Sequence, residues 1–339
     1  MNIPSNQSEE GKKRIEELDF LKALFILLMI TFHLAYIGDG YPYLKRFVYT
    51  FHMPGFLIIS GYLSKVGKPI KSYCQTVLWL AVPYIIMEMG YVAMASLLPI
   101  RDHIPILTVE VIFDRLCLHP LGPYWYLHTL IICGTLYFSV FRWAKASAFS
   151  RLIILGITYY VLAQSGIISL ACAMYFLVGV LVRQSPLSFL TIFRRSWWSL
   201  VVLAILYFYP SAFNRATIGG TMIVYFVFSF LLTVFPYVPI KSKEILLFLG
   251  RNSLVLYIFS PIFTLCCKVF IPYLSFDSTR LLFLCISLSI CITGSLPICV
   301  IGSLGICKVL DLLHLSPFLF GRKHALTSFN SSKEQVYSK

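Results

Sequence analysis

The chain is dominated by apolar segments that short polar loops separate. A helix needs about 20 mainly apolar residues to cross a bilayer, and ten segments reach or approach that length. They cover residues 18–38, 46–64, 73–98, 123–141, 150–164, 166–182, 197–213, 217–239, 245–271 and 281–307. The pattern therefore predicts an all-α fold, a polytopic membrane bundle of about ten transmembrane helices.

The composition extends this prediction to most of the 339 residues. Hydrophobic residues make up 58% of the chain and charged residues 12%, whereas soluble proteins carry about 25% charged residues. The net charge of +14 is spread between the apolar segments, so nucleic acid is not an expected partner. The ten cysteines form neither C-x-x-C nor a Cys/His pattern with zinc spacing, and no metal is expected.

The distribution of lysine and arginine predicts the orientation, because cytoplasmic loops are enriched in both. Ten alternating spans place 20 of these residues on the side of the N-terminus and 7 on the far side. Both termini are then cytoplasmic, in a multi-pass protein of the inner, or cytoplasmic, cell membrane. The predicted domains are a cytoplasmic N-terminal segment (1–17), a transmembrane domain (18–310) and a partly disordered cytoplasmic tail (311–339). No removable signal peptide is expected.

The first apolar segment carries three polar residues that are costly in lipid, namely Asp19, Lys22 and His33. Eleven residues of α-helix rise about 16.5 Å and turn about 1100°, which is close to three full turns. Lys22 and His33 therefore share one face, with Lys22 near the cytoplasmic entry and His33 near the middle of the membrane. Each has a structural alternative: Lys22 as a side chain that extends to the interface, and His33 as a neutral, hydrogen-bonded imidazole.

This arrangement suits a ligand with an anionic head and a long arm. A lysine at the entry favours phosphate groups as a point charge, and a histidine deeper in the membrane suits proton transfer or nucleophilic attack. Acyl-coenzyme A has that shape.

The same residues resemble the first-helix signature of the integral membrane acyltransferase family 3. Arg14, Leu18-Asp19, Lys22 and His33 match it in order. Four further segments resemble family motifs in family order: "FHMPGFLIISGYL" (51–63), "YWYLHTL" (124–130), "YFLVGVLV" (175–182) and "LGRNSLVLYIF" (249–259). The resemblance covers residues from about 14 to 310.

The resemblance implies transfer of an acyl group, commonly acetyl, from cytoplasmic acetyl-CoA or another acyl-CoA. The implied acceptor is a hydroxyl of a carbohydrate or glycoconjugate at or across the membrane, as in O-acetylation of cell-envelope polysaccharides, with membrane lipid as the surroundings. Two positions depart from the family. Ser260 stands where the family often has histidine, and Thr76 and Trp79 stand where it tends to have R-x-x-R.

The expected catalytic residues are His33 and Asp19. His33 acts as a general base on the acceptor hydroxyl or as a covalent acyl carrier. Asp19 orients and pairs Lys22 or Arg14. The expected donor-binding residues are Arg14, Lys22, Lys68, Lys71 and Ser60. Close helix packing by small residues is the structural alternative for Ser60.

The expected acceptor-binding residues are His52, Trp125 and His128. A structural hydrogen bond is the alternative for His52, and a place in the interfacial aromatic belt is the alternative for Trp125. The far-side loop 99–122 is expected to be either an amphipathic interfacial helix or a lid or acceptor-binding surface outside the membrane. The competing function is a secondary transporter of a small polar solute, although transporters often carry paired repeats with broken helices and none is visible here.

Overall fold

The computed structural model describes residues 14–97 and 103–312, with side chains as far as residue 298. Within those residues every element of regular secondary structure is a helix. The predicted N-terminal segment 1–17 lies largely outside the described residues, and the predicted tail 311–339 lies almost wholly outside them. The division into domains therefore stays a prediction.

Fifteen α-helices follow one another in the described residues, and four short 3-10 helices begin at residues 122, 210, 235 and 267. The α-helices are α1 (Glu16–His33), α2 (Ala35–Gly40), α3 (Pro42–Leu63), α4 (Ile70–Leu97), α5 (Val109–Cys117), α6 (Trp125–Trp143), α7 (Ala148–Gln164), α8 (Leu170–Gln184), α9 (Phe189–Ile192), α10 (Trp198–Tyr207), α11 (Ile218–Val234), α12 (Ile240–Arg251), α13 (Ser253–Cys266), α14 (Ile271–Leu274) and α15 (Leu281–Leu312).

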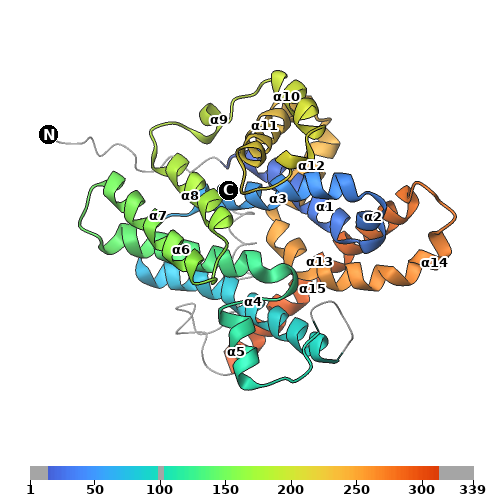
Figure 1. Cartoon of the computed structure of the whole chain (residues 1–339). Coiled ribbons are helices and arrows are strands. Elements are labelled where there is room, and N and C mark those ends of the chain that lie inside the picture. The colour runs from blue at the N-terminus through green and yellow to red at the C-terminus, as the bar shows by residue number, and fades with distance from the viewer. Residues whose placement is uncertain (1–13, 98–102, 313–339) are drawn as a thin grey trace, which may run out of the picture.

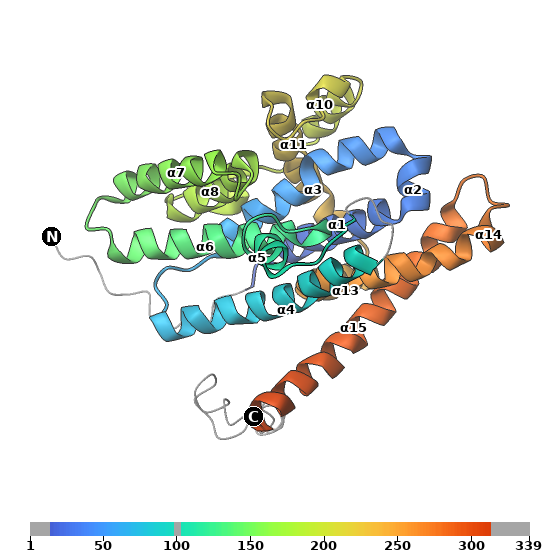
Figure 2. The ribbon, with the colours of Figure 1, turned by 60° about the horizontal axis from the view of Figure 1, so that its bottom comes forward.

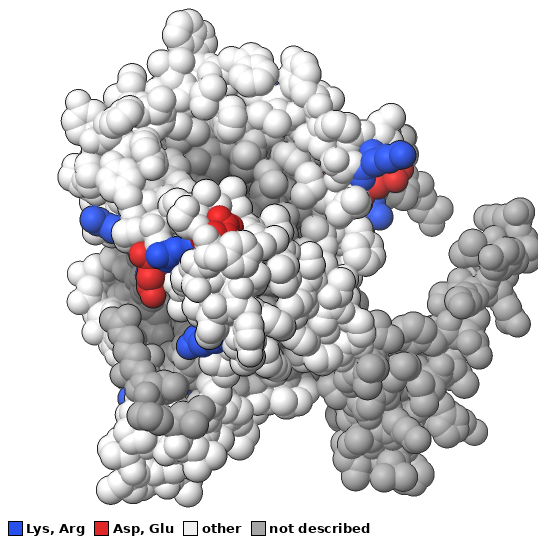
Figure 3. All heavy atoms as spheres, turned by 90° about the vertical axis from the view of Figure 1, so that its right-hand side faces the viewer, with Lys and Arg blue, Asp and Glu red and all other residues white. Residues whose placement is uncertain are grey.

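Five stretches of helix in the described residues are long and apolar enough to cross a membrane. They are Ile70–Leu97, Gly122–Trp143, Ile218–Tyr237, Ser253–Leu274 and Leu281–Ile298, and α7, α8 and α10 are shorter apolar helices. Figure 3 shows a face of the molecule on which charged side chains gather at only a few places. The structure supports a helical membrane protein, while the count of ten spans and the orientation stay predictions.

The centre of the bundle is formed by α1 and α3, with α6, α7 and α8 lying together on one side (Figures 1 and 2). Glycines allow two close helix crossings. Gly61 of α3 and Gly179 of α8 each press against the backbone of the other helix, and a Cβ at either position would collide with it. Gly250 of α12 meets the backbone of Asp19 in the same way. Small residues at such crossings let membrane helices pack closely.

The first helix ends earlier than the sequence predicts. The apolar segment 18–38 suggested one continuous helix with His33 in its interior, but α1 ends at His33 and the backbone is extended at Leu34. A separate short helix, α2, follows. The prediction of one continuous helix over 18–38 is therefore wrong, and His33 lies in the last turn of α1.

The segment 109–121 contains α5, an amphipathic helix that begins at the capping hydroxyl of Thr108. Three side chains from the bundle hold the backbone of this segment. The Tyr84 hydroxyl donates to Leu116 O (2.7 Å), and His128 Nε2 donates to Cys117 O (2.8 Å). The amide of Leu121 donates to the buried carboxylate of Glu88 (2.5 Å). These bonds fasten the segment to α4 and α6.

A tight turn before α15 is organised by Asp277. Its carboxylate accepts hydrogen bonds from the amide and hydroxyl of Thr279 (2.9 and 2.6 Å) and from the amide of Leu282 (2.9 Å). The bond from the Thr279 hydroxyl is the main reason why the pKa of the Asp277 carboxyl is held below its usual range. Asp277 thus satisfies donors that the start of α15 would otherwise leave without partners.

Candidate functional site

A cavity of about 730 Å³ opens between α1, α3, α13, the start of α6 and the segment before α11. Segments far apart in the chain line it. They contribute Met29 and His33; Lys45, Arg46, Tyr49, Thr50, His52 and Met53; Pro123 and Trp125; Pro210, Ser211, Phe213, Asn214 and Arg215; and Tyr257. We call this the first cavity. Its volume lies within the range typical of small-molecule sites.

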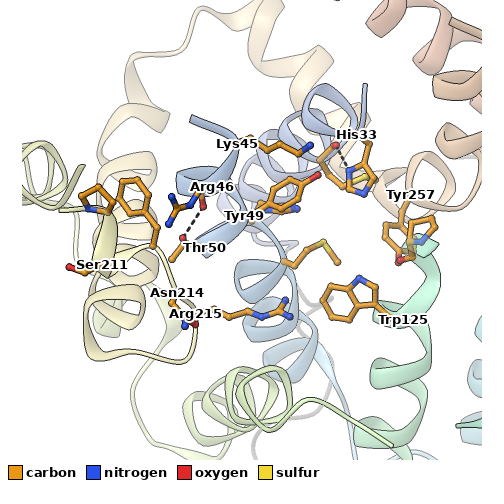
Figure 4. A pocket seen from close by; sticks show the side chains of 16 residues that line it. His33, Lys45, Arg46, Tyr49, Thr50, Trp125, Ser211, Asn214, Arg215 and Tyr257 are labelled. Atoms are coloured by element: carbon orange, nitrogen blue, oxygen red, sulfur yellow. Dashed lines mark hydrogen bonds between the residues drawn. The ribbon is translucent and has the colours of Figure 1, made fainter. Parts of the chain in front are cut away.

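The His33 ring is exposed on the wall of the first cavity. Its Nδ1 donates a hydrogen bond to the carbonyl oxygen of Met29, one helical turn earlier, at 2.7 Å (Figure 4). Because Nδ1 carries the proton, the neutral ring has its lone pair on Nε2. In the described part of the chain no group hydrogen-bonds this Nε2, which is therefore free to accept a proton.

His52 of α3 repeats this arrangement in a more buried setting. Its Nδ1 donates to Val48 O at 2.8 Å, and its Nε2 is buried with no hydrogen-bond partner among the described residues. The Tyr49 ring packs near both histidines. Its centre is 5.9 Å from the centre of the His33 ring and 5.1 Å from the centre of the His52 ring. A buried polar atom without a partner is costly, so the unpaired nitrogen of His52 is a candidate for ligand contact.

Three cations line the first cavity, namely Lys45, Arg46 and Arg215. The Arg215 guanidinium stacks on Trp125, with Cζ 5.2 Å from the ring centre. Figure 4 shows Arg215 reaching toward Trp125, and Lys45 reaching toward His33. No aspartate or glutamate is found among the described residues that line this cavity.

A second polar centre surrounds Asp19 at the start of α1. The Asp19 carboxylate is 4% exposed. It pairs with Arg14 (2.5 and 3.2 Å), with Lys22 (2.8 Å) and, less closely, with Arg251 of α12 (3.8 Å). The structure therefore joins Asp19 to both predicted partners and adds Arg251. The sequence signal for Arg251 was the segment "LGRN", in which Arg251 follows Gly250. Gly250 lets α12 pack closely against α1.

A smaller cavity of about 240 Å³, the second cavity, lies between the end of α3, α4 and α6. Ser60, Lys65 and Lys68 line it. The Lys68 ammonium donates to the Thr76 hydroxyl (3.2 Å), and Ser60 shares a hydrogen bond of 2.8 Å with the hydroxyl of Tyr126. Lys65 was not among the expected site residues. The signal that could have found it is its positive charge close to the expected residue Lys68 in the sequence.

Tyr126 contacts one lining residue of each cavity. Its hydroxyl bonds to Ser60 of the second cavity, and its ring packs 5.2 Å from that of Tyr257, which lines the first. The cavities also lie toward opposite ends of α3. From Arg46 to Ser60 the helix rises about 21 Å.

The structure thus distributes the predicted site residues over three places. His33, His52 and Trp125 share the first cavity, Ser60 and Lys68 share the second, and Arg14, Asp19 and Lys22 form the cluster at the start of α1.

Two predicted residues lie apart from all three places. Lys71 is exposed in the first turn of α4 and is not among the described residues that line either cavity. His128 donates to Cys117 O and does not line the first cavity, because its ring is used to hold the segment 109–121.

The predicted track along one face of α1 is not an open passage in the described residues. From α1, only Met29 and His33 line the first cavity. Lys22 is taken up by Asp19, and α12 packs closely against this part of α1. Access to the start of α1 is therefore limited by the pair of Lys22 with Asp19 and by the close approach of Gly250 to Asp19.

Comparison with known families gives a match over most of the chain. The model of the acyltransferase 3 family, described as an acyltransferase domain, matches residues 15–300. No curated protein and no solved structure shows a significant match to the chain. In the described residues there is no group of three or more His, Cys, Asp and Glu side chains that could hold a metal ion.

Proposed function

The chain belongs to the acyltransferase 3 family, and we propose that it transfers an acyl group, acetyl in the first instance, from acyl-CoA to a hydroxyl of a carbohydrate or glycoconjugate. The observation that carries this proposal is the open Nε2 of His33 on the wall of a cavity large enough for a sugar. Trp125 on the same wall offers a flat apolar surface against which a sugar ring can pack.

His33 is the general base in this proposal. Its Nε2 takes the proton of the acceptor hydroxyl while that oxygen attacks the thioester carbonyl. The resulting tetrahedral intermediate collapses with cleavage of the C–S bond, and the departing thiolate recovers the proton from Nε2. The bond from Nδ1 to Met29 O keeps the ring in the required tautomer and helps to stabilise its protonated form.

The donor approaches through the second cavity, and the acceptor occupies the first. Lys65 and Lys68 provide positive charge for the phosphates of coenzyme A. The pair of Ser60 and Tyr126 stands where the acyl end of the donor passes from one cavity toward the other. Transfer across a membrane needs separate places for the donor and the acceptor. The two cavities, toward opposite ends of α3, suit that requirement.

The first test replaces His33 by glutamine, which keeps a polar side chain but cannot act as a base. Surface glycans of cells that produce either the wild-type chain or His33→Gln are compared by mass spectrometry. Loss of a general base lowers a rate by about 10²–10⁴-fold, so we expect the variant to lose one acyl mass from the glycans. His119→Gln, at an exposed histidine paired with Asp114, is the matched control and keeps it.

A second measurement separates the two roles of His33. Purified protein is incubated with radiolabelled acetyl-CoA and no acceptor, and its mass is then determined. A general base leaves the protein unlabelled, whereas an acetyl group on His33 would replace this mechanism by a covalent one. Acylation retained within tenfold in His33→Gln would refute both roles.

A further inference from the structure

The first cavity has a charge that the transfer reaction does not require. A neutral sugar needs only hydroxyl, amide and aromatic partners, and Thr50, Ser211, Asn214 and Trp125 already provide them. The cavity wall nevertheless adds Lys45, Arg46 and Arg215, with no carboxylate among its described lining residues.

The charges on this wall are not neutralised within the described structure. Arg46 and Arg215 have no acidic partner there. Lys45 lies 3.9 Å from Asp39, whose side chain is 76% exposed, and such a pair is weak in water. Lys45 and Arg215 are half-buried, and Arg46 is exposed. Half-buried charges are stabilised by a counter-charge, and the neighbouring histidines can supply none because they are neutral or positive.

The positions of the cations suit an anionic ligand. Trp125 supports the flat guanidinium of Arg215 at 5.2 Å, which limits the orientations that the side chain can adopt. Arginine in a fixed orientation binds carboxylate or phosphate through two parallel hydrogen bonds. The Lys45 side chain reaches toward His33 (Figure 4), so an anion that contacts these cations places its neighbouring hydroxyls near the His33 ring.

From this geometry we infer that the acceptor is itself an anion, a sugar or glycoconjugate that carries a carboxylate or phosphate group, and that Arg46 and Arg215 bind that group. The inference rests on the proposed function for the statement that the occupant of the first cavity is the acceptor. The acidic group fixes the sugar in the cavity, and a free hydroxyl of the same molecule is acylated beside His33.

The test measures binding and needs no turnover. The full chain in phosphatidylcholine nanodiscs is titrated with trigalacturonate and with its methyl ester, which keeps the hydroxyls and loses the charge. Glucose 6-phosphate and glucose form the corresponding phosphate pair. We expect at least one anionic probe to bind tenfold or more tightly than its neutral counterpart, since charge-assisted hydrogen bonds are stronger than neutral ones.

Two variants test whether Arg46 and Arg215 bind the anionic group. Arg46→Gln and Arg215→Gln each weaken the anionic probe tenfold or more and leave the neutral one unchanged. Arg194→Gln, at an exposed arginine that does not line the cavity, is the matched control and binds as the wild type does. Equal binding of charged and neutral probes, or unchanged binding in both cavity variants, overturns the inference.

Two further measurements test whether the cations bind coenzyme A or lipid headgroups instead of the acceptor. If coenzyme A displaces the probe from the first cavity, the cations serve the donor, and the inference is overturned. If nanodiscs that contain phosphatidylglycerol abolish binding, the cations serve lipid headgroups, with the same consequence. His33→Gln keeps the anionic probe bound. An acid-selective cavity in a protein that acylates nothing would therefore refute the proposed function and the role of the anion as acceptor, while the binding of an anion by Arg46 and Arg215 would stand.

Discussion

Replacing Asp19 by asparagine removes the acidic side chain that Arg14, Lys22 and Arg251 share. The carboxylate is 4% exposed, and its shortest bond to Lys22 is 2.8 Å long. Breaking a buried ion pair by removing one partner costs about 3–5 kcal/mol. Arg14 and Arg251 are 58% and 48% exposed and can be hydrated instead, so we expect a loss near the lower limit, about 3 kcal/mol.

The contribution of each cation follows from its distance and exposure. Lys22 is 17% exposed and in hydrogen-bond contact with Asp19, so its coupling to Asp19 should be about 1.5–3 kcal/mol, as for a hydrogen bond to a charged group. Arg251, at 3.8 Å and half exposed, should couple by about 0–1 kcal/mol.

The assay is a pair of double-mutant cycles, Asp19→Asn with Lys22→Gln and Asp19→Asn with Arg251→Gln. Free energies of unfolding are measured in detergent micelles by tryptophan fluorescence. Glu16→Gln is the control, because Glu16 is half exposed in its pair with Lys243, and we expect it to cost less than about 1 kcal/mol. The reasoning fails if Asp19→Asn is as stable as the wild type, or if Arg251 couples to Asp19 more strongly than Lys22 does.

Three further changes test individual contacts in the fold. Gly61→Leu forces a side chain into the backbone contact between α3 and α8 and should prevent recovery of folded protein by size-exclusion chromatography, whereas Gly90→Leu, where the added Cβ meets open space, should not. His128→Phe removes the bond to Cys117 O and should raise hydrogen–deuterium exchange in residues 109–121; unchanged exchange would show that Glu88 and Tyr84 suffice. Asp277→Ala should raise exchange in the first turn of α15 alone, and equal exchange in both proteins would count against the capping role.

The candidate site residues on α1 could be found from the sequence because short-range rules govern them. His33, Asp19 and Lys22 stand out as polar residues in an apolar segment, and this contrast needs no knowledge of the fold. The pairing of Asp19 with Lys22 follows from a spacing of three residues on one helix. The helical class follows from the length of the apolar segments, and the family from motifs that are contiguous in the chain.

Other parts of the site depend on residues far apart in the chain. Arg215 enters the first cavity from the segment before α11, and Arg251 reaches Asp19 from α12. His128 has the same residue type as His52 and lies on an adjoining element, yet it turns to Cys117. The end of α1 at His33 was also missed, because the apolar pattern continues through α2 without a break.

The sequence by itself determined the helical class, the family and the candidate base. Only the tertiary structure decided which side chains share a cavity, and the reason is physical. In a soluble helix the apolar face marks the side that packs, but lipid and protein interior are both apolar, so hydrophobicity says little about which face of a membrane helix meets a neighbour. Close crossings at glycines such as Gly61 and Gly250 contribute to that choice here, and the crossing at Gly250 brings the neighbouring Arg251 close to Asp19.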